Sequence, residues 1–215
     1  RQETNKGMTY NFNFVLEKSS GEYFMWAADD DEWDSNYILK CVNILNKYPD
    51  VVLCTSHSAL INSKREIIRL YSENCNTIGL SKIERLKKTI LEIIQNTTFY
   101  GLRRIDITKR LLIQNKYGYD HVHMMQLSYF GSIAVIPEVL FFCNIEGIGS
   151  SSNKIVQETG DNSFLIKISP PLSIMKSFFE EIFTTSHLTT REKCIVSLFV
   201  IMRYIKSPYR NEILR

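Results

Sequence analysis

Apolar residues along this chain occur in two patterns, short continuous runs and longer stretches with helical spacing. The continuous runs at residues 23–28, 51–54 and 132–145 predict strands, the last run as two strands joined at a tight bend. Helical spacing predicts helices at residues 37–48 and 82–95, the second beginning with a capping-box signal at Ser81 and Glu84. The polar stretch at residues 72–80 predicts a surface loop. Strands that alternate with helices favour an α/β fold in which parallel strands are joined by right-handed crossovers.

The pattern changes after residue 146. Residues 147–163 are rich in Gly, Ser and Asn, which predicts a loop, and two apolar stripes at helical spacing follow within residues 164–215. Ser169 and Thr189 supply the starting signals of these two helices. We therefore expect three parts: an α/β domain over residues 1–146, a loop over 147–163, and a C-terminal helical hairpin over 164–215.

Four consecutive acids, Asp29 to Glu32, follow the run at 23–28. In open α/β sheets the carboxyl edge of the strands is where ligands bind. Hard oxygen donors at such an edge suit Mg²⁺ or Mn²⁺. The alternative is a helix start, because Asp34 or Ser35 can cap the next helix and acids favour its positive end. Four neighbouring acids also repel one another unless a cation or solvent screens them, so both interpretations stay open.

Residues 5–33, NKGMTYNFNFVLEKSSGEYFMWAADDDEW, resemble the middle of a family 2 glycosyltransferase of the GT-A fold. In that family a Gly-Glu-Tyr strand ends in an acidic motif of the DXD type. The resemblance implies that Asp30 binds the divalent cation and that Asp29 and Asp31 flank it at the bound substrate. Ala28 stands where the commonest form of the motif has its first acid.

A second resemblance to the same family lies in residues 117–131, YGYDHVHMMQLSYFG. There the family has an acid that enters a helix and acts as the general base toward the acceptor hydroxyl, which implies this role for Asp120. A carboxylate within hydrogen-bond range of a hydroxyl can do this chemistry. Asp120 is equally suited to cap its helix. His121 and His123 are two residues apart and do not share a helix face, so they are not expected to form a metal pair.

The resemblance covers roughly residues 5–146. Within it, residues 97–103, TTFYGLR, resemble the strand that precedes a short helix in the family. It implies a GT-A-like, Rossmann-like mixed sheet with flanking helices in an N-terminally truncated fragment that lacks the family's first strands. The implied activity is the metal-dependent, inverting transfer of a sugar from a nucleotide-sugar donor to a hydroxyl of a glycan or lipid-linked acceptor, as in polysaccharide biosynthesis. The isolated fragment is expected to be inactive. The competing hypothesis is a non-catalytic α/β interaction module or an inactive truncated homologue.

Composition limits the binding partners, metal sites and cellular locations that remain open for this chain. The chain has 215 residues, of which 44% are hydrophobic and 23% charged, which suits one well-filled core. Its net charge of +3, without a basic run, argues against a nucleic-acid partner. Five cysteines without a CxxC pair argue against structural zinc and disulfides, so we expect a reducing, cytoplasmic location, including the cytoplasmic face of a membrane. The apolar faces of the last helices are the expected place for a peripheral membrane contact.

Overall fold

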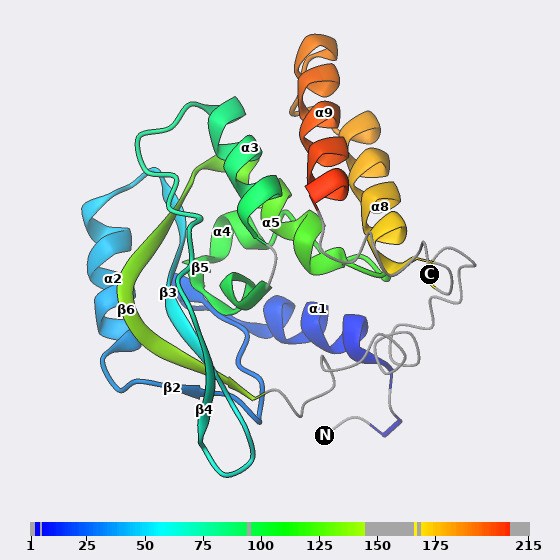
Figure 1. Ribbon diagram of the computed structural model, residues 1–215. Coiled ribbons are helices and arrows are strands. Elements are labelled where there is room, and N and C mark those ends of the chain that lie inside the picture. Colours follow the sequence, from blue (N-terminus) through cyan, green and yellow to red (C-terminus); the bar gives the residue numbers. More distant parts are fainter. Residues whose placement is uncertain (1–2, 5, 94–95, 145–165, 167–168, 207–215) are drawn as a thin grey trace.

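The computed structural model describes residues 3–4, 6–93, 96–144, 166 and 169–206, and the expected loop at 147–163 lies outside them. Within this part, a curved mixed sheet is covered by helices on both faces, and a helical hairpin stands beside them (Figure 1). The helices are α1 Met8–Lys18, α2 Tyr37–Lys47, α3 Lys82–Glu92, the 3-10 helix η1 Asn96–Tyr100, α4 Ile105–Thr108, α5 Tyr119–Phe130, α8 Pro170–Thr184 and α9 Thr190–Lys206.

The strands that the structure describes form one sheet in the order β1-β5-β3-β6-β2, and β4 pairs with β3. Their bounds are β1 Tyr23–Phe24, β2 Glu32–Trp33, β3 Val51–Ile61, β4 Ile67–Tyr71, β5 Leu102–Arg104 and β6 Ser132–Asn144. Strands β3 and β6 are parallel neighbours, whereas β1 and β3 each pair antiparallel with β5. Strands β1, β3 and β6 therefore run in the same direction, and their carboxyl ends lie at one edge of the sheet.

Three strand predictions need correction. The strand expected at 23–28 is limited to Tyr23–Phe24, and its expected parallel partner β3 is separated from it by β5. The two strands expected within 132–145 are one continuous strand, β6. Pro137 interrupts the register, since Ser56 pairs with Ile136 but His57 pairs with Val139. A proline has no N–H for the ladder, and a bulge accommodates it without ending the strand.

Two connecting segments also differ from expectation. Residues 97–103, expected as a strand, form most of η1 and the start of β5. Residues 72–80, expected as a surface loop, are irregular but bury Glu73, Cys75 and Thr77. In both cases contacts with the sheet and α5, which local sequence does not reveal, decide the conformation.

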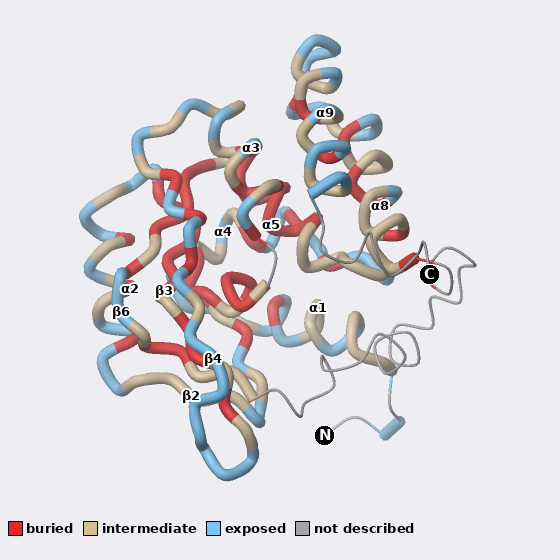
Figure 2. The backbone as a smooth tube through the Cα atoms, viewed as in Figure 1, coloured by how far each residue is buried: buried red, intermediate tan, exposed pale blue. Residues whose placement is uncertain are grey.

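The core has three parts, and buried backbone runs through β3, β6 and α5 (Figure 2). One cluster lies between the sheet and the helices α1, η1 and α5, and a second lies between the sheet and α2. The third joins α3 and α5 to the hairpin, with Val122 and Met125 of α5 in the same cluster as Phe178 of α8 and Val196 of α9. The hairpin is thus packed onto the α/β domain by shared buried side chains.

The helical hairpin begins as its sequence predicts. The hydroxyl of Ser169 accepts a bond from the amide of Leu172, and Thr189 and Glu192 form reciprocal capping bonds at the start of α9.

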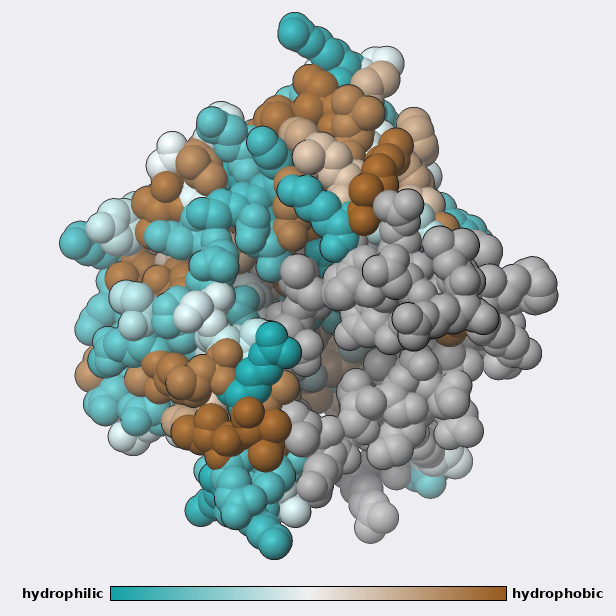
Figure 3. Space-filling view, viewed as in Figure 1, coloured by the Kyte–Doolittle hydropathy of each residue, from teal (hydrophilic) through white to brown (hydrophobic). Residues whose placement is uncertain are grey.

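Apolar side chains remain exposed on α9 and β4, where brown surface gathers in Figure 3. A search of the described helices finds none with the length and apolarity that crossing a membrane requires.

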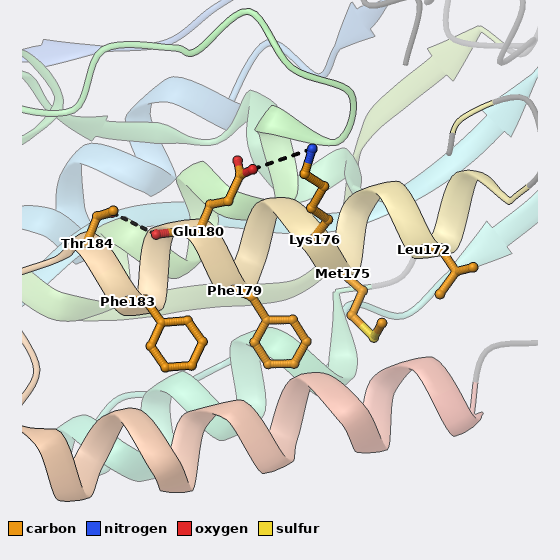
Figure 4. A pocket seen from close by; sticks show the side chains of 7 residues that line it. All are labelled: Leu172, Met175, Lys176, Phe179, Glu180, Phe183 and Thr184. Atoms are coloured by element: carbon orange, nitrogen blue, oxygen red, sulfur yellow. Dashed lines mark hydrogen bonds and ion pairs between the residues drawn. The ribbon is translucent and has the colours of Figure 1, made fainter. Parts of the chain in front are cut away.

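A groove of about 600 Å³ runs along α8 (Figure 4). Its apolar wall consists of Leu172, Met175, Phe179 and Phe183. The charged residues beside it, Lys176 and Glu180, pair with each other at 3.6 Å. Because its lining is apolar and these charges are mutually satisfied, the groove carries no group suited to the chemistry of sugar transfer.

Candidate functional site

The acid turn, residues 29–31, lies between β1 and β2. Asp29 and Asp30 are exposed, whereas Asp31 is half-buried and accepts a hydrogen bond of 2.9 Å from the amide of Asn144. Asn144 is the last residue of β6, and it pairs with Ile61 at the end of β3. The turn therefore lies at the edge where the carboxyl ends of β1, β3 and β6 meet.

Helix capping does not account for these acids. The N-cap position of α2 is Asn36 rather than Asp34 or Ser35, and Asn36 makes no side-chain capping bond. The Asp34 carboxylate instead accepts from the Asn36 amide at 2.8 Å, which closes a turn before the helix. No hydrogen bond in the described structure joins residues 29–32 to the start of α2.

The local electrostatics of the turn are those of crowded carboxylates. The pKa of Asp31 is raised by burial, lowered by the Asn144 amide, and raised again by the charges of Asp30 and Asp29. Burial and the same acids raise the pKa of the Cys143 thiol to about 12, so this neighbour stays protonated at neutral pH. A cation beside the turn would relieve the repulsion among the three acids.

Asp120 lies in the first turn of α5. The N-cap is Gly118, in a left-handed conformation with φ of 73°, so the expectation of Asp120 as N-cap was wrong. Its Oδ2 atom accepts a hydrogen bond of 2.9 Å from Nδ2 of Asn96, the first residue of η1. The carboxylate is half-buried and is held from η1 rather than by its own helix.

Tyr100, the last residue of η1, connects the two groups of acids. Its pKa is raised first by burial and then by the negative charges of Asp31 and Asp120, with a smaller contribution from Asp30. One phenol is therefore within electrostatic range of both acid groups, which lie far apart in the sequence. The fold brings the acid turn and Asp120 to the same region of the molecule.

A buried carboxylate holds η1 from one side. Glu73 is 9% exposed and accepts hydrogen bonds from the hydroxyls of Thr97 and Thr98. Burial raises its pKa, and the two hydroxyls partly offset that effect. The backbone amide of Glu73 donates to Nδ1 of His57 on β3 at 3.0 Å. These bonds fix η1 against the sheet.

A buried arginine holds the other end of η1. Arg103 is fully buried, donates to the carbonyl oxygens of Phe99 and Gly101, and lies over the rings of Trp26 and Phe99 at 4.7 and 5.2 Å. Burial lowers its pKa to about 9, so it remains charged at neutral pH. The guanidinium satisfies the last turn of η1, where a helix leaves carbonyl groups without partners.

The helical hairpin reaches the same region through Arg203 of α9. Its Nη1 atom donates to the carbonyl oxygens of Ile90 and Ile93 at 2.6 Å each, and its Nη2 atom lies 3.2 Å from Nδ1 of His121. Burial lowers the pKa of Arg203 to about 10, and the charge of Asp120 opposes that shift. The same burial lowers the pKa of His121 to about 4, so this ring is neutral at pH 7.

We tested the acid turn as a cation site by its donor set. Among the described residues, no group of three or more His, Cys, Asp and Glu side chains could hold a metal ion alone. In enzymes that act on phosphate-containing substrates, Mg²⁺ is usually bound by one or two carboxylates. Substrate phosphates and water molecules complete its coordination. Exposed carboxylates at Asp29 and Asp30, with oxygen donors only, fit that mode of binding.

Comparison with known proteins identifies the family. The sequence profile described as Glycosyl transferase family 2 matches residues 1–111, more than half of the chain. The chain belongs to this family. As a member of family 2 it is a glycosyltransferase by resemblance, as the sequence predicted. No curated protein sequence matches the chain.

Solved structures share the fold of this family 2 chain. The crystal structure of S. aureus TarS 1-349 superposes with a TM-score of 0.63 at 12% identity, covering 98% of this chain and 55% of that chain. The crystal structure of S. aureus TarS 1-349 in complex with UDP-GlcNAc gives a TM-score of 0.63 at 14% identity, covering 100% and 58%. The chain thus spans less than two thirds of either relative. The expected GT-A-like mixed sheet with flanking helices is confirmed.

Several residues of this site were not predicted from the sequence. Tyr100 and Glu73 come from segments that were expected to be strand and surface loop, and Asn96 lies between two expected elements. Arg203 lies in a helix whose apolar stripe had suggested packing or a membrane contact. In the sequence, these residues could have been noticed only as polar residues within mainly apolar segments. Arg203, near the end of the apolar stripe of α9, is an example.

Proposed function

We propose that this family 2 domain contributes the cation site and the general base of a metal-dependent, inverting glycosyltransferase. A sugar would pass from a nucleotide-sugar donor to a hydroxyl of a glycan or lipid-linked acceptor. The observation that supports this assignment is the electrostatic proximity of both Asp31 and Asp120 to Tyr100. In a direct displacement, the donor sugar and the acceptor hydroxyl would bind between the acid turn and Asp120.

The roles follow from the chemistry of direct displacement. Asp30 would hold Mg²⁺ or Mn²⁺, with Asp29 and Asp31 beside it at the donor. The bound cation would offset the negative charge that develops on the leaving diphosphate. Asp120 would accept the proton of the acceptor hydroxyl as that oxygen bonds to the anomeric carbon, and the bond to the diphosphate breaks on the opposite face.

The neighbours of Asp120 suit a base. Tyr100 and Tyr119 both have raised pKa values, chiefly because of burial, and therefore stay neutral. His121 is neutral at pH 7 as well. Asp120 is the carboxylate in the first turn of α5, and we assign the role of base to it.

The donor class and the location are parts of the same proposal. A neighbour in fold was solved with UDP-GlcNAc, so a uridine diphosphate sugar is the first donor to test. We propose a cytoplasmic enzyme in which the exposed apolar residues of α9 allow a peripheral contact with a membrane that carries the acceptor. Leu198 and Ile205, which are 58% and 53% exposed, support this contact.

Two variants of the complete protein test the assignment by release of UDP from UDP-GlcNAc or other UDP sugars, with Mn²⁺ or Mg²⁺. Asp30→Ala is expected to abolish metal-dependent transfer without a change in melting temperature, because an exposed acid contributes under ~1 kcal/mol to folding. Asp106→Ala, at an exposed aspartate of α4, is the matched control and keeps its activity. Full turnover by Asp30→Ala would remove the cation role.

Asp120→Asn tests the base. Asparagine keeps an oxygen that can accept the Asn96 bond, but it cannot take a proton, so transfer is expected to fall by roughly 10²–10⁴ with an unchanged melting temperature. Full transfer by this variant would reject Asp120 as the base. If both variants transfer normally, other residues supply the cation site and the base. If the wild type itself transfers no sugar, the non-catalytic module becomes the better hypothesis.

A further inference from the structure

Asn96 occupies an unusual position beside Asp120. Its side-chain amide donates to Oδ2 of Asp120 at 2.9 Å, while its own Oδ1 atom is buried without a hydrogen-bond partner in the described structure. An ionised carboxylate only accepts hydrogen bonds, so the amide must present its nitrogen rather than its oxygen to Asp120. The orientation that serves Asp120 therefore leaves the amide oxygen unsatisfied.

Buried polar atoms without a partner are uncommon and costly, and they often mark sites where function has been favoured over stability. A side chain chosen for packing alone would not carry a buried amide with an unsatisfied oxygen. The hydrogen bond to Asp120 is the contact that accounts for an asparagine at position 96.

Two buried clamps determine where Asn96 lies. Before it in the chain, the guanidinium of Arg203 binds the carbonyl oxygens of Ile90 and Ile93 at 2.6 Å. After it, Thr97 and the next residue donate their hydroxyls to buried Glu73. The described residues nearest to Asn96, Ile93 before it and Thr97 after it, are thus each bound by a buried side chain.

We propose that Asn96 is a positioning residue for the proposed general base. By holding Oδ2 of Asp120, it turns the other carboxylate oxygen, Oδ1, toward the acceptor hydroxyl. This inference rests on the proposed function, because it requires that Asp120 accept the proton.

The surroundings allow the role to be tested by pH. The titratable and charged groups that interact with Asp120 are Tyr100 of η1, Tyr119 and His121 of α5, and Arg203 of α9. The tyrosines and the arginine do not titrate on the acidic side of pH 7, whereas His121 has a pKa of about 4. His121 is present in the wild type and in every Asn96 variant, so the comparison between them isolates the change at position 96. A carboxylate introduced at position 96 would be a new titrating group in direct contact with Asp120.

The experiment compares Asn96→Ala, Asn96→Asp and the control Asn115→Ala in the complete protein, with a UDP sugar that the wild type uses. Asn115 also has a side-chain bond, from the hydroxyl of Thr9 at 3.1 Å, but it is exposed. We expect Asn96→Ala to lower kcat about tenfold with an unchanged KM for the donor, a small part of what a general base contributes. Its melting temperature should change little, because removal of the unsatisfied oxygen and loss of the bond to Asp120 oppose each other.

Asn96→Asp should move the acidic limb of the profile of kcat/KM for the acceptor to higher pH by about one unit or more, because two adjacent carboxylates share a proton. A purely structural role predicts the opposite pattern, in which Asn96→Ala lowers the melting temperature and leaves kcat unchanged. That pattern would overturn the inference.

Asp120→Asn separates this inference from the proposed function. If Asp120→Asn keeps full transfer, Asp120 is not the base, and the positioning role of Asn96 is rejected as well. If Asp120→Asn loses transfer while Asn96→Ala keeps its kcat, Asp120 remains the base and only the positioning role is rejected.

Discussion

Arg203→Met tests whether the helical hairpin is anchored on the catalytic domain by a buried clamp. The variant removes two charge-assisted bonds of 2.6 Å to the last turn of α3, whose carbonyl groups carry the negative end of the helix dipole. Bonds of this kind contribute roughly 1.5–3 kcal/mol each, and leaving a buried carbonyl unpaired costs a similar amount. Desolvation opposes this gain, as the lowered pKa of Arg203, about 10, indicates.

The net expectation is a loss of about 2–4 kcal/mol in the free energy of unfolding. At roughly 2–4 °C per kcal/mol for a domain of this size, the melting temperature should fall by about 4–16 °C. Thermal melts followed by circular dichroism, with urea titrations for the free energy, measure both quantities. The urea m-value should be unchanged if the hairpin and the domain still unfold together.

Lys193→Met is the matched control on the same helix. Lys193 also donates to a carbonyl at a helix end, that of Phe183 at 2.9 Å, but this bond is exposed. Its removal should cost under ~1 kcal/mol. If Arg203→Met and Lys193→Met melt within about 2 °C of each other, the clamp contributes no more than a surface contact. Apolar packing of α9 against α3 and α8 would then account for the docking of the hairpin.

Three further outcomes follow from local geometry. Gly131→Ala would place a Cβ 2.2 Å from the carbonyl oxygen of Asp50 and 2.5 Å from Cγ1 of Val52, so it should cost at least the ~1–3 kcal/mol of an overpacked core. Gly79→Ala, with φ of +79° and open space around it, should cost only ~1–2 kcal/mol of backbone strain, and melts that rank the two variants in the other order would contradict this reasoning. Glu73→Gln addresses pH: burial raises the pKa of Glu73 above its usual 4.5, so its contribution to stability is complete below the unfolded pKa and is lost as pH rises through the folded pKa. The variant should therefore gain stability relative to the wild type between pH 4 and pH 8 in urea titrations, and a constant difference would exclude a buried ionising group. Alanine at the N-cap serine of α8 should cost about 1 kcal/mol, and threonine should restore most of it in the same melts.

The sequence by itself determined those features of the protein that arise from neighbouring residues. The spacing of apolar residues predicted α2 and α3, and the capping box at Ser81 and Glu84 forms as expected. The sequence also predicted that α9 starts after Thr189, and the capping bonds of Thr189 and Glu192 are present. Helix periodicity and caps involve groups within about one turn of each other, so a local pattern carries them. The motif around residues 5–33 identified the family for a similar reason, because its residues are contiguous.

Only the tertiary structure decided how distant segments complete the site. Pro137 suggested a break, yet pairing with β3 along almost its whole length keeps β6 as one bulged strand. Residues 96–100 carry the β-favouring pair Thr97 and Thr98, but their hydroxyls bind buried Glu73 and η1 forms instead. The free energy of such contacts depends on residues far away in the chain, and no local pattern contains it. For this reason the acids themselves could be found in the sequence, whereas the residues that hold Asp120 could be found only in the fold.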